Sequence, residues 1–157
     1  FGAAKVDIAQ LAVWTCVLAP DAVADWKVPL QLTAKAVDDS PNSYRALNHH
    51  GAVLYRAGRY REALTRLAEA EKAFQPEQEK TDPIPYCWLF QAMTHHRLGE
   101  AREARQWLAR AAQWIDQAEQ ASPRDGTSAG PPSWNRPLTL QMLRREAEDL
   151  LSKKSGP

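Results

Sequence analysis

The residues of this chain that could do chemistry are first of all four histidines, which occur as two adjacent pairs. His49 precedes His50, and His95 precedes His96. Neighbouring side chains on a helix point about 100° apart, so neither pair can chelate a metal ion by itself. A metal site would need ligands from both pairs. The alternative is that His50 and His95 pack toward a following helix while His49 and His96 face outward, and we expect this packing and no metal site.

The two cysteines and the sequence motifs also give no sign of catalysis. Cys16 and Cys87 fall in separate expected helices and lack a second C-x-x-C member, which is typical of small core residues. The sequence contains no phosphate-cradling glycine loop, no H-E-x-x-H and no nucleophile elbow. We therefore expect a protein that is not an enzyme and that carries no cofactor.

The six tryptophans could form either a ligand cage or part of a core. Aromatic bulk at helical core-like positions usually packs, and four of them have such positions: Trp14, Trp88, Trp107 and Trp114. Trp134 lies in the Pro/Gly/Ser-rich stretch 121–136, which is expected to be a loop, and is the one we leave free for a ligand.

Composition narrows the classes of partner. The 157 residues are enough for one domain with its own core, and 20 Lys+Arg against 19 Asp+Glu give a net charge of +1. This balance argues against a nucleic-acid binder that works by bulk charge. No apolar stretch reaches about 18 residues, so no membrane span is expected. We expect a cytoplasmic protein with neither nucleic acid nor membrane as partner.

An internal repeat organises the middle of the chain. Two copies, 41 residues apart, each place four small residues at spacings of 7, 5 and 7: Gly51, Gly58, Ala63 and Ala70, then Ala92, Gly99, Ala104 and Ala111. Each copy has apolar residues at helical spacing before and after its second small residue. The pattern predicts two helices per copy, joined by a turn at the glycine and close enough to need small residues where they cross.

This arrangement resembles the tetratricopeptide repeat (TPR) family, in which Leu47 and Trp88 match the large residue early in the first helix. The family's period is about 34 residues, so the stretch QPEQEKTDPI makes the linker about seven residues longer. The resemblance implies an all-α fold of about seven helices, in antiparallel hairpins stacked as a right-handed superhelix, or α-solenoid. The chain also resembles the C-terminal TPR tails of large bacterial multidomain proteins with kinase-like or β-propeller domains. A first residue that is Phe1 and not Met suggests a piece of such a protein.

The expected layout is a single TPR-like domain over 1–157. Its parts are a degenerate first repeat at 1–42, repeats at 43–76 and 85–118, and a capping helix at 137–153. In the first repeat Val17 and Pro29 stand where the other copies have small residues. The capping helix carries Leu140, Leu143, Ala147, Leu150 and Leu151 on one face, and we expect its outer side to be polar.

The resemblance also implies a binding site, because the first helices of TPR hairpins line a concave groove. The matching outward residues would be Arg45, Asn48, Tyr55, Arg56, Tyr86, Leu89, Met93, His96 and Arg97. Such side chains can hold a carboxylate, a peptide backbone or an apolar side chain. The expectation is a non-enzymatic module that binds a peptide or protein segment, and the basic edges favour an acidic one. The alternatives are a solvated helix face, and a structural cap or spacer without a ligand.

Overall fold

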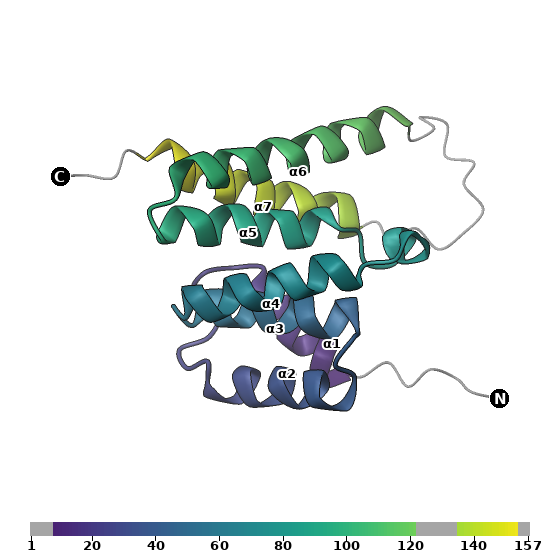
Figure 1. Cartoon of the computed structure of the whole chain (residues 1–157), viewed down its shortest axis with the longest axis vertical. Coiled ribbons are helices and arrows are strands. Elements are labelled where there is room, and N and C mark those ends of the chain that lie inside the picture. The colour runs from purple at the N-terminus through teal and green to yellow at the C-terminus, as the bar shows by residue number, and fades with distance from the viewer. Residues whose placement is uncertain (1–7, 122–134, 154–157) are drawn as a thin grey trace. The chain divides into compact units, whose positions relative to one another are not determined.

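The computed structural model describes residues 8–121 and 135–153, and within these ranges the chain is entirely helical (Figure 1). Seven α-helices and one 3-10 turn form there and no strand does, which confirms the all-α fold class. The chain divides into two compact units, Phe1–Asp82 and Pro83–Pro157. The handedness of a superhelix stays a prediction.

The first unit contains four helices. Their bounds are α1 Ile8–Val17, α2 Lys27–Asp39, α3 Tyr44–Arg56 and α4 Tyr60–Ala73, followed by the 3-10 turn η1 Pro76–Lys80 in the long linker. Helix α3 begins after Ser43, whose hydroxyl oxygen accepts a hydrogen bond from the backbone N–H of Ala46 at 3.3 Å. Hairpins α1/α2 and α3/α4 fall within the ranges predicted for the first two repeats.

Both repeat turns use the same glycine-dependent helix ending. Gly58 and Gly99 have φ of 78° and 81°, a left-handed conformation that favours glycine. The residue after each glycine donates a backbone hydrogen bond to a carbonyl in the last turn of the helix. The N–H of Arg59 binds the Leu54 carbonyl and the N–H of Glu100 binds the His95 carbonyl, both at 2.9 Å. The predicted turns at the two glycines are therefore confirmed.

The crossing of α3 and α4 explains the small residue in the middle of the first helix. A Cβ atom on Gly51 would lie 2.7 Å from Leu67 Cγ and 3.3 Å from the Leu67 backbone nitrogen. Leu67 is fully buried, as are Ala63 and Ala70 on the same helix. Absence of a side chain at position 51 lets Leu67 fill the space between the two helices.

The second unit contains α5 Pro85–Arg97, α6 Ala101–Ala121 and α7 Asn135–Ser152. Helix α7 packs against both α5 and α6 (Figure 1). Of its predicted inner face, Leu140, Leu143 and Ala147 are buried, whereas Leu150 and Leu151 are half-buried. No helix in the described parts of the chain is both long and apolar enough to cross a membrane.

Candidate functional site

Most of the side chains predicted to line a groove are inside the protein. Five of the nine are buried, with exposed fractions of 5% or less: Asn48, Tyr55, Tyr86, Leu89 and Met93. The outward orientation predicted for these five is therefore wrong. A buried side chain cannot contact a peptide unless the helices around it rearrange.

In the second unit the physical reason is helix α7. The hydroxyl of Tyr86 on α5 lies 2.5 Å from Oγ1 of Thr139 on α7, and Leu89 and Met93 follow on the same face of α5 at spacings of three and four residues. α7 thus packs on the face of α5 that carries these three side chains. The helix predicted to cap the repeats also covers part of the predicted groove.

In the first unit, Tyr55 and Arg56 of α3 contact other residues of the same unit. The ring of Tyr55 lies 5.7 Å from that of Tyr60, and the guanidinium of Arg56 lies 5.5 Å from the Tyr55 ring. Arg56 Nε also donates a hydrogen bond to the Val17 carbonyl at the end of α1, at 2.8 Å. The hydrogen bond to Val17 joins α3 to the end of α1, so the Arg56 side chain has a structural role.

The remaining predicted groove residues lie at or near the surface. Arg45 is exposed and binds the Asp82 carboxylate, with Nη2 2.5 Å and Nε 2.8 Å from Oδ2. Arg97 is exposed and His96 is half-buried. The cation on Arg45 is already neutralised by Asp82, and Arg56 is engaged with the backbone of α1.

The histidine pairs pack in a different way from the prediction. His49 is buried and stacks on Trp14 of α1, with ring centroids 4.6 Å apart and an interplanar angle of 17°, so its predicted outward orientation is wrong. Burial lowers the pKa of His49 to about 4. His50 turns toward α2, where its Nδ1 lies 2.9 Å from Thr33 Oγ1, and burial lowers its pKa as well.

His95 contacts the Glu100 carboxylate at 2.5 Å. Among the described residues, no group of three or more His, Cys, Asp or Glu side chains is placed to hold a metal ion. Cys87 on α5 is fully buried and Cys16 on α1 is half-buried, and neither forms a disulfide bond.

Three of the described tryptophans, Trp14, Trp88 and Trp107, contact neighbouring side chains. The Arg110 guanidinium on α6 lies 4.3 Å from the ring of Trp88 on α5, a cation–π contact that joins the two helices, and 5.4 Å from the ring of Trp107 on its own helix. Trp88 is buried, and Trp14 stacks on His49. Trp134, the tryptophan left free for a ligand, lies outside the described residues.

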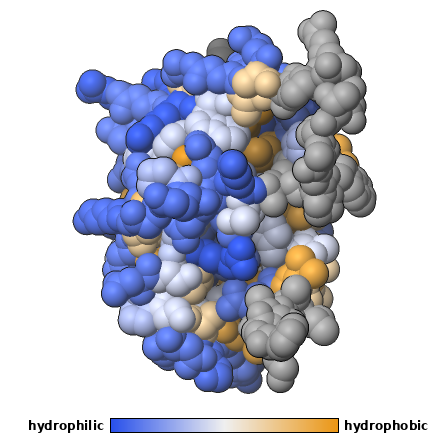
Figure 2. All heavy atoms as spheres, turned by 90° about the vertical axis from the view of Figure 1, so that its right-hand side faces the viewer, coloured by the Kyte–Doolittle hydropathy of each residue, from blue (hydrophilic) through white to orange (hydrophobic). Residues whose placement is uncertain are grey.

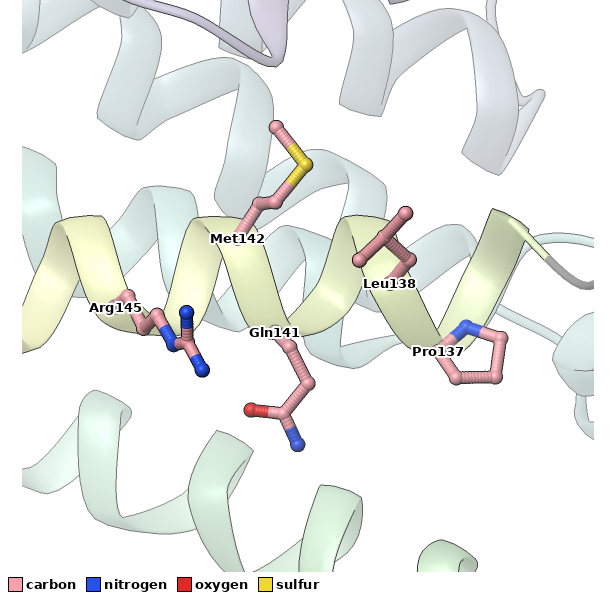
Figure 3. Close-up of a pocket in the computed structure, with 5 residues that line it drawn as sticks. All are labelled: Pro137, Leu138, Gln141, Met142 and Arg145. Atoms are coloured by element: carbon pink, nitrogen blue, oxygen red, sulfur yellow. The ribbon is translucent and has the colours of Figure 1, made fainter.

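An open surface of mixed chemistry lies on α7. Leu138 and Met142, one helical turn apart, are 56% and 45% exposed. With three neighbours they line a pocket of about 390 Å³: Pro137, Leu138, Gln141, Met142 and Arg145. Figure 3 shows Leu138 and Met142 along one edge of the helix, and Gln141 and Arg145 along the other. We call these five residues the α7 outer face.

The sequence contained a signal for this surface. Leu138 and Met142 are four residues apart, on the side of the helix opposite to Leu140 and Leu143. Helix α7 therefore has two apolar stripes, and its outer side is less polar than predicted. On the face of the protein drawn in Figure 2, apolar side chains reach the surface as small groups among hydrophilic ones.

The two polar side chains of the α7 outer face differ in whether they bind another residue of the protein. Gln141 Nε2 donates a hydrogen bond to the Glu119 carboxylate at the end of α6. The neighbouring Arg144 binds Asp116 at 2.6 Å and Glu148 at 2.8 Å, and these carboxylates raise its pKa further. Arg145 is exposed and forms no hydrogen bond or ion pair with any described residue. The α7 outer face thus offers apolar contact area, an anchored amide and an open guanidinium.

Comparison of the chain with family models, with curated proteins and with solved structures finds no match. The resemblance to the TPR family rests on the repeated spacing of small residues and stays a prediction. The functional argument therefore depends on the surface chemistry of the chain itself.

Proposed function

We propose that the chain is a TPR-like, non-enzymatic interaction module that binds a peptide or protein segment, and that the α7 outer face is its binding surface. The observation that carries this proposal is the pocket on α7, where two exposed apolar side chains adjoin an open guanidinium. Exposed apolar side chains beside polar groups can supply the contacts of a peptide-binding surface.

The types of side chain in the pocket favour recognition over catalysis. Proline, leucine, glutamine, methionine and arginine are not groups that serve as a nucleophile or as a general base near neutral pH. Leu138 and Met142 can bury apolar area, Gln141 can accept a backbone N–H, and Arg145 can hold a carboxylate. Together they can select a segment by its shape and charge.

The α7 outer face replaces the groove on α3 and α5 in this proposal because of accessibility. Five of the predicted groove side chains are buried, whereas Leu138 and Met142 are open to solvent. The binding function expected from the sequence is kept, and its location is changed.

A structural cap without a ligand is the second candidate. It is favoured by the other face of α7, where Leu140, Leu143 and Ala147 are buried against α5 and α6. A cap would complete the core of the second unit and would bind nothing. Binding experiments separate the two candidates because only the first predicts a ligand that depends on Leu138 and Met142.

The test is a fluorescence-anisotropy screen of labelled acidic, basic and apolar peptide pools. The double variant Leu138→Ser/Met142→Ser should weaken binding at least about tenfold, because it removes the apolar contact area. Its melting temperature should stay close to that of the unchanged protein, since both side chains are exposed. The matched control Leu11→Ser/Val28→Ser removes two exposed apolar side chains from α1 and α2 and should bind like the unchanged protein.

Two results would count against the proposal. Equal binding by the α7 double variant and the unchanged protein would place the site elsewhere on the chain. Failure of every pool to bind the unchanged protein would favour the cap.

A further inference from the structure

Helix α1 has fewer buried side chains than α3, the helix against which it packs. Val13 and Val17 are the buried side chains in the described part of α1, whereas most residues of α3 are buried. Residues 18–26, which join α1 to α2, form no helix and are mostly exposed. Segments with few buried apolar contacts open locally before the whole protein unfolds. Release of α1 from α3 therefore needs less free energy than unfolding of the α3/α4 hairpin.

Trp14 of α1 covers a histidine of α3 that lacks a partner for one ring nitrogen. The rings of Trp14 and His49 stack at 4.6 Å, and Nδ1 of His49 is buried with no hydrogen-bond partner among the described residues. A neutral imidazole can keep this nitrogen unprotonated, but the protonated ring must donate from both nitrogens. A buried charge without an acceptor is unfavourable. Protonation of His49 therefore favours a state in which water reaches Nδ1.

The groups around His49 do not offset this penalty. Asp82 is the carboxylate that acts on His49, and it is already paired with Arg45. Helix α1 contains no Asp, Glu, Lys, Arg or His, and its titratable side chain is the Cys16 thiol. The indole of Trp14 attracts a cation through its face, but the Nδ1 hydrogen lies in the plane of the stacked imidazole and points past that face. The charged groups of α2 and α4 that lie nearest act on the neighbouring His50 instead: Asp38, Arg59, Glu62 and Arg66.

We propose that α1 is a pH-sensitive latch: in mild acid, protonation of His49 releases α1 from α3 while the α3/α4 hairpin stays folded. Release separates Trp14 from His49 and breaks the hydrogen bond between Arg56 and the Val17 carbonyl. It exposes the side of α3 that carries His49. The latch does not involve the α7 outer face, so it goes beyond the proposed function and does not depend on it.

The two states of the latch differ in how tightly they bind a proton. The pKa of His49 is about 4 when α1 is in place, against an ordinary 6.5 for a ring in water. The open state therefore binds the proton more tightly, and release becomes more favourable as the pH falls from about 6.5 to about 4. Between about pH 7 and pH 5 the ratio of open to closed α1 should rise about twentyfold.

Hydrogen exchange of backbone amides, followed by NMR on the unchanged protein at about pH 7 and pH 5, tests the latch. Protection in the middle of α1 should be lower than in α4 at both pH values, because local release needs less free energy than unfolding of the unit. Protection in α1 should also fall about twentyfold between the two pH values, once the intrinsic effect of pH on exchange is removed.

Substitutions at the two adjacent histidines assign the effect to one of them. His49→Phe keeps an aromatic ring against Trp14 and removes the titrating group, so protection in α1 should no longer change with pH. His50→Gln is the matched control, since glutamine can still hydrogen-bond to Thr33 and His49 is left in place. Protection in α1 of this variant should still fall about twentyfold.

Three results would overturn the latch. Equal protection in α1 and α4 at both pH values would mean that α1 opens only when the whole unit unfolds. A fall in α1 protection that persists in His49→Phe would assign the proton to another group. The third result needs no variant: NMR of the unchanged protein would show the His49 ring titrating with a pKa near 6.5 while α1 keeps its protection, so that the closed state accepts the charge.

Discussion

At the scale of single residues, His49 is a titratable side chain that the fold removes from water. Its ring is buried between α3 and α1, it stacks on Trp14, and its Nδ1 has no hydrogen-bond partner among the described residues. The charges that act on it are those of Asp82 and Arg45, which are paired with each other. Burial therefore dominates, and it favours the neutral imidazole.

We predict that His49 makes the protein less stable in mild acid. Its pKa falls from an ordinary 6.5 to about 4 in the folded state. Between these values the unfolded chain binds a proton that the folded chain excludes, so the free energy of unfolding decreases as the pH falls. The full effect is about 3 kcal/mol below pH 4. His50, whose pKa is also lowered by burial, acts in the same direction.

Urea unfolding from neutral pH down to about pH 4 measures this effect. His49→Phe keeps an aromatic ring against Trp14 and removes the titrating group, so its free energy of unfolding should depend less on pH than that of the unchanged protein. The same pH dependence in both proteins would contradict the assignment.

At the scale of secondary-structure elements, the α3/α4 crossing depends on the missing side chain at Gly51. We predict that Gly51→Ala lowers the free energy of unfolding by about 1–3 kcal/mol, because the new methyl group would overlap Leu67. Helix propensity alone would make the alanine variant more stable, because alanine is the better helix former by about 1 kcal/mol. A loss of stability would therefore come from the overlap with Leu67. Thermal unfolding followed by circular dichroism measures the change.

Ala92 gives a matched control because it has the same repeat position on α5. It is fully buried, so the second hairpin accommodates the methyl group that the first excludes. Ala92→Gly should lower the free energy of unfolding by about 1 kcal/mol through the poorer helix propensity of glycine. A higher melting temperature for Gly51→Ala would show that α3 and α4 do not cross as closely as described.

At the scale of the whole molecule, the chain consists of two compact units with separate sets of buried side chains. Leu47, Leu54 and Leu67 belong to the first unit, and Leu89, Met93 and Leu143 to the second. The first set lies on α3 and α4 and the second on α5 and α7, and each of these helix pairs packs within its own unit. The chain therefore has two centres of local packing.

We predict that residues 1–82 and 83–157, prepared as separate fragments, each form helix and unfold cooperatively in urea. The reason is that the helix contacts of each unit join segments of that unit. Far-UV circular dichroism and urea titration of the fragments check this. A spectrum of unfolded chain for either fragment would contradict the prediction.

Much of the architecture could be predicted from local sequence patterns. The small residues at repeated spacing predicted the α3/α4 and α5/α6 hairpins, and Gly58 and Gly99 predicted their turns. Leu140, Leu143 and Ala147 predicted the inner face of α7, which is buried. These predictions succeed because helix periodicity, a left-handed glycine and a close crossing depend on residues near one another in the sequence.

The binding surface was decided by tertiary structure. The sequence shows that Tyr86, Leu89 and Met93 share a face of α5, but it does not show that α7, which begins near residue 135, packs there. It likewise shows Leu138 and Met142 on a second stripe of α7, and the structure shows that this stripe stays exposed. Periodicity determines which side chains lie together on a helix. Which face is buried depends on contacts between distant segments, and those are set by the packing of the whole unit.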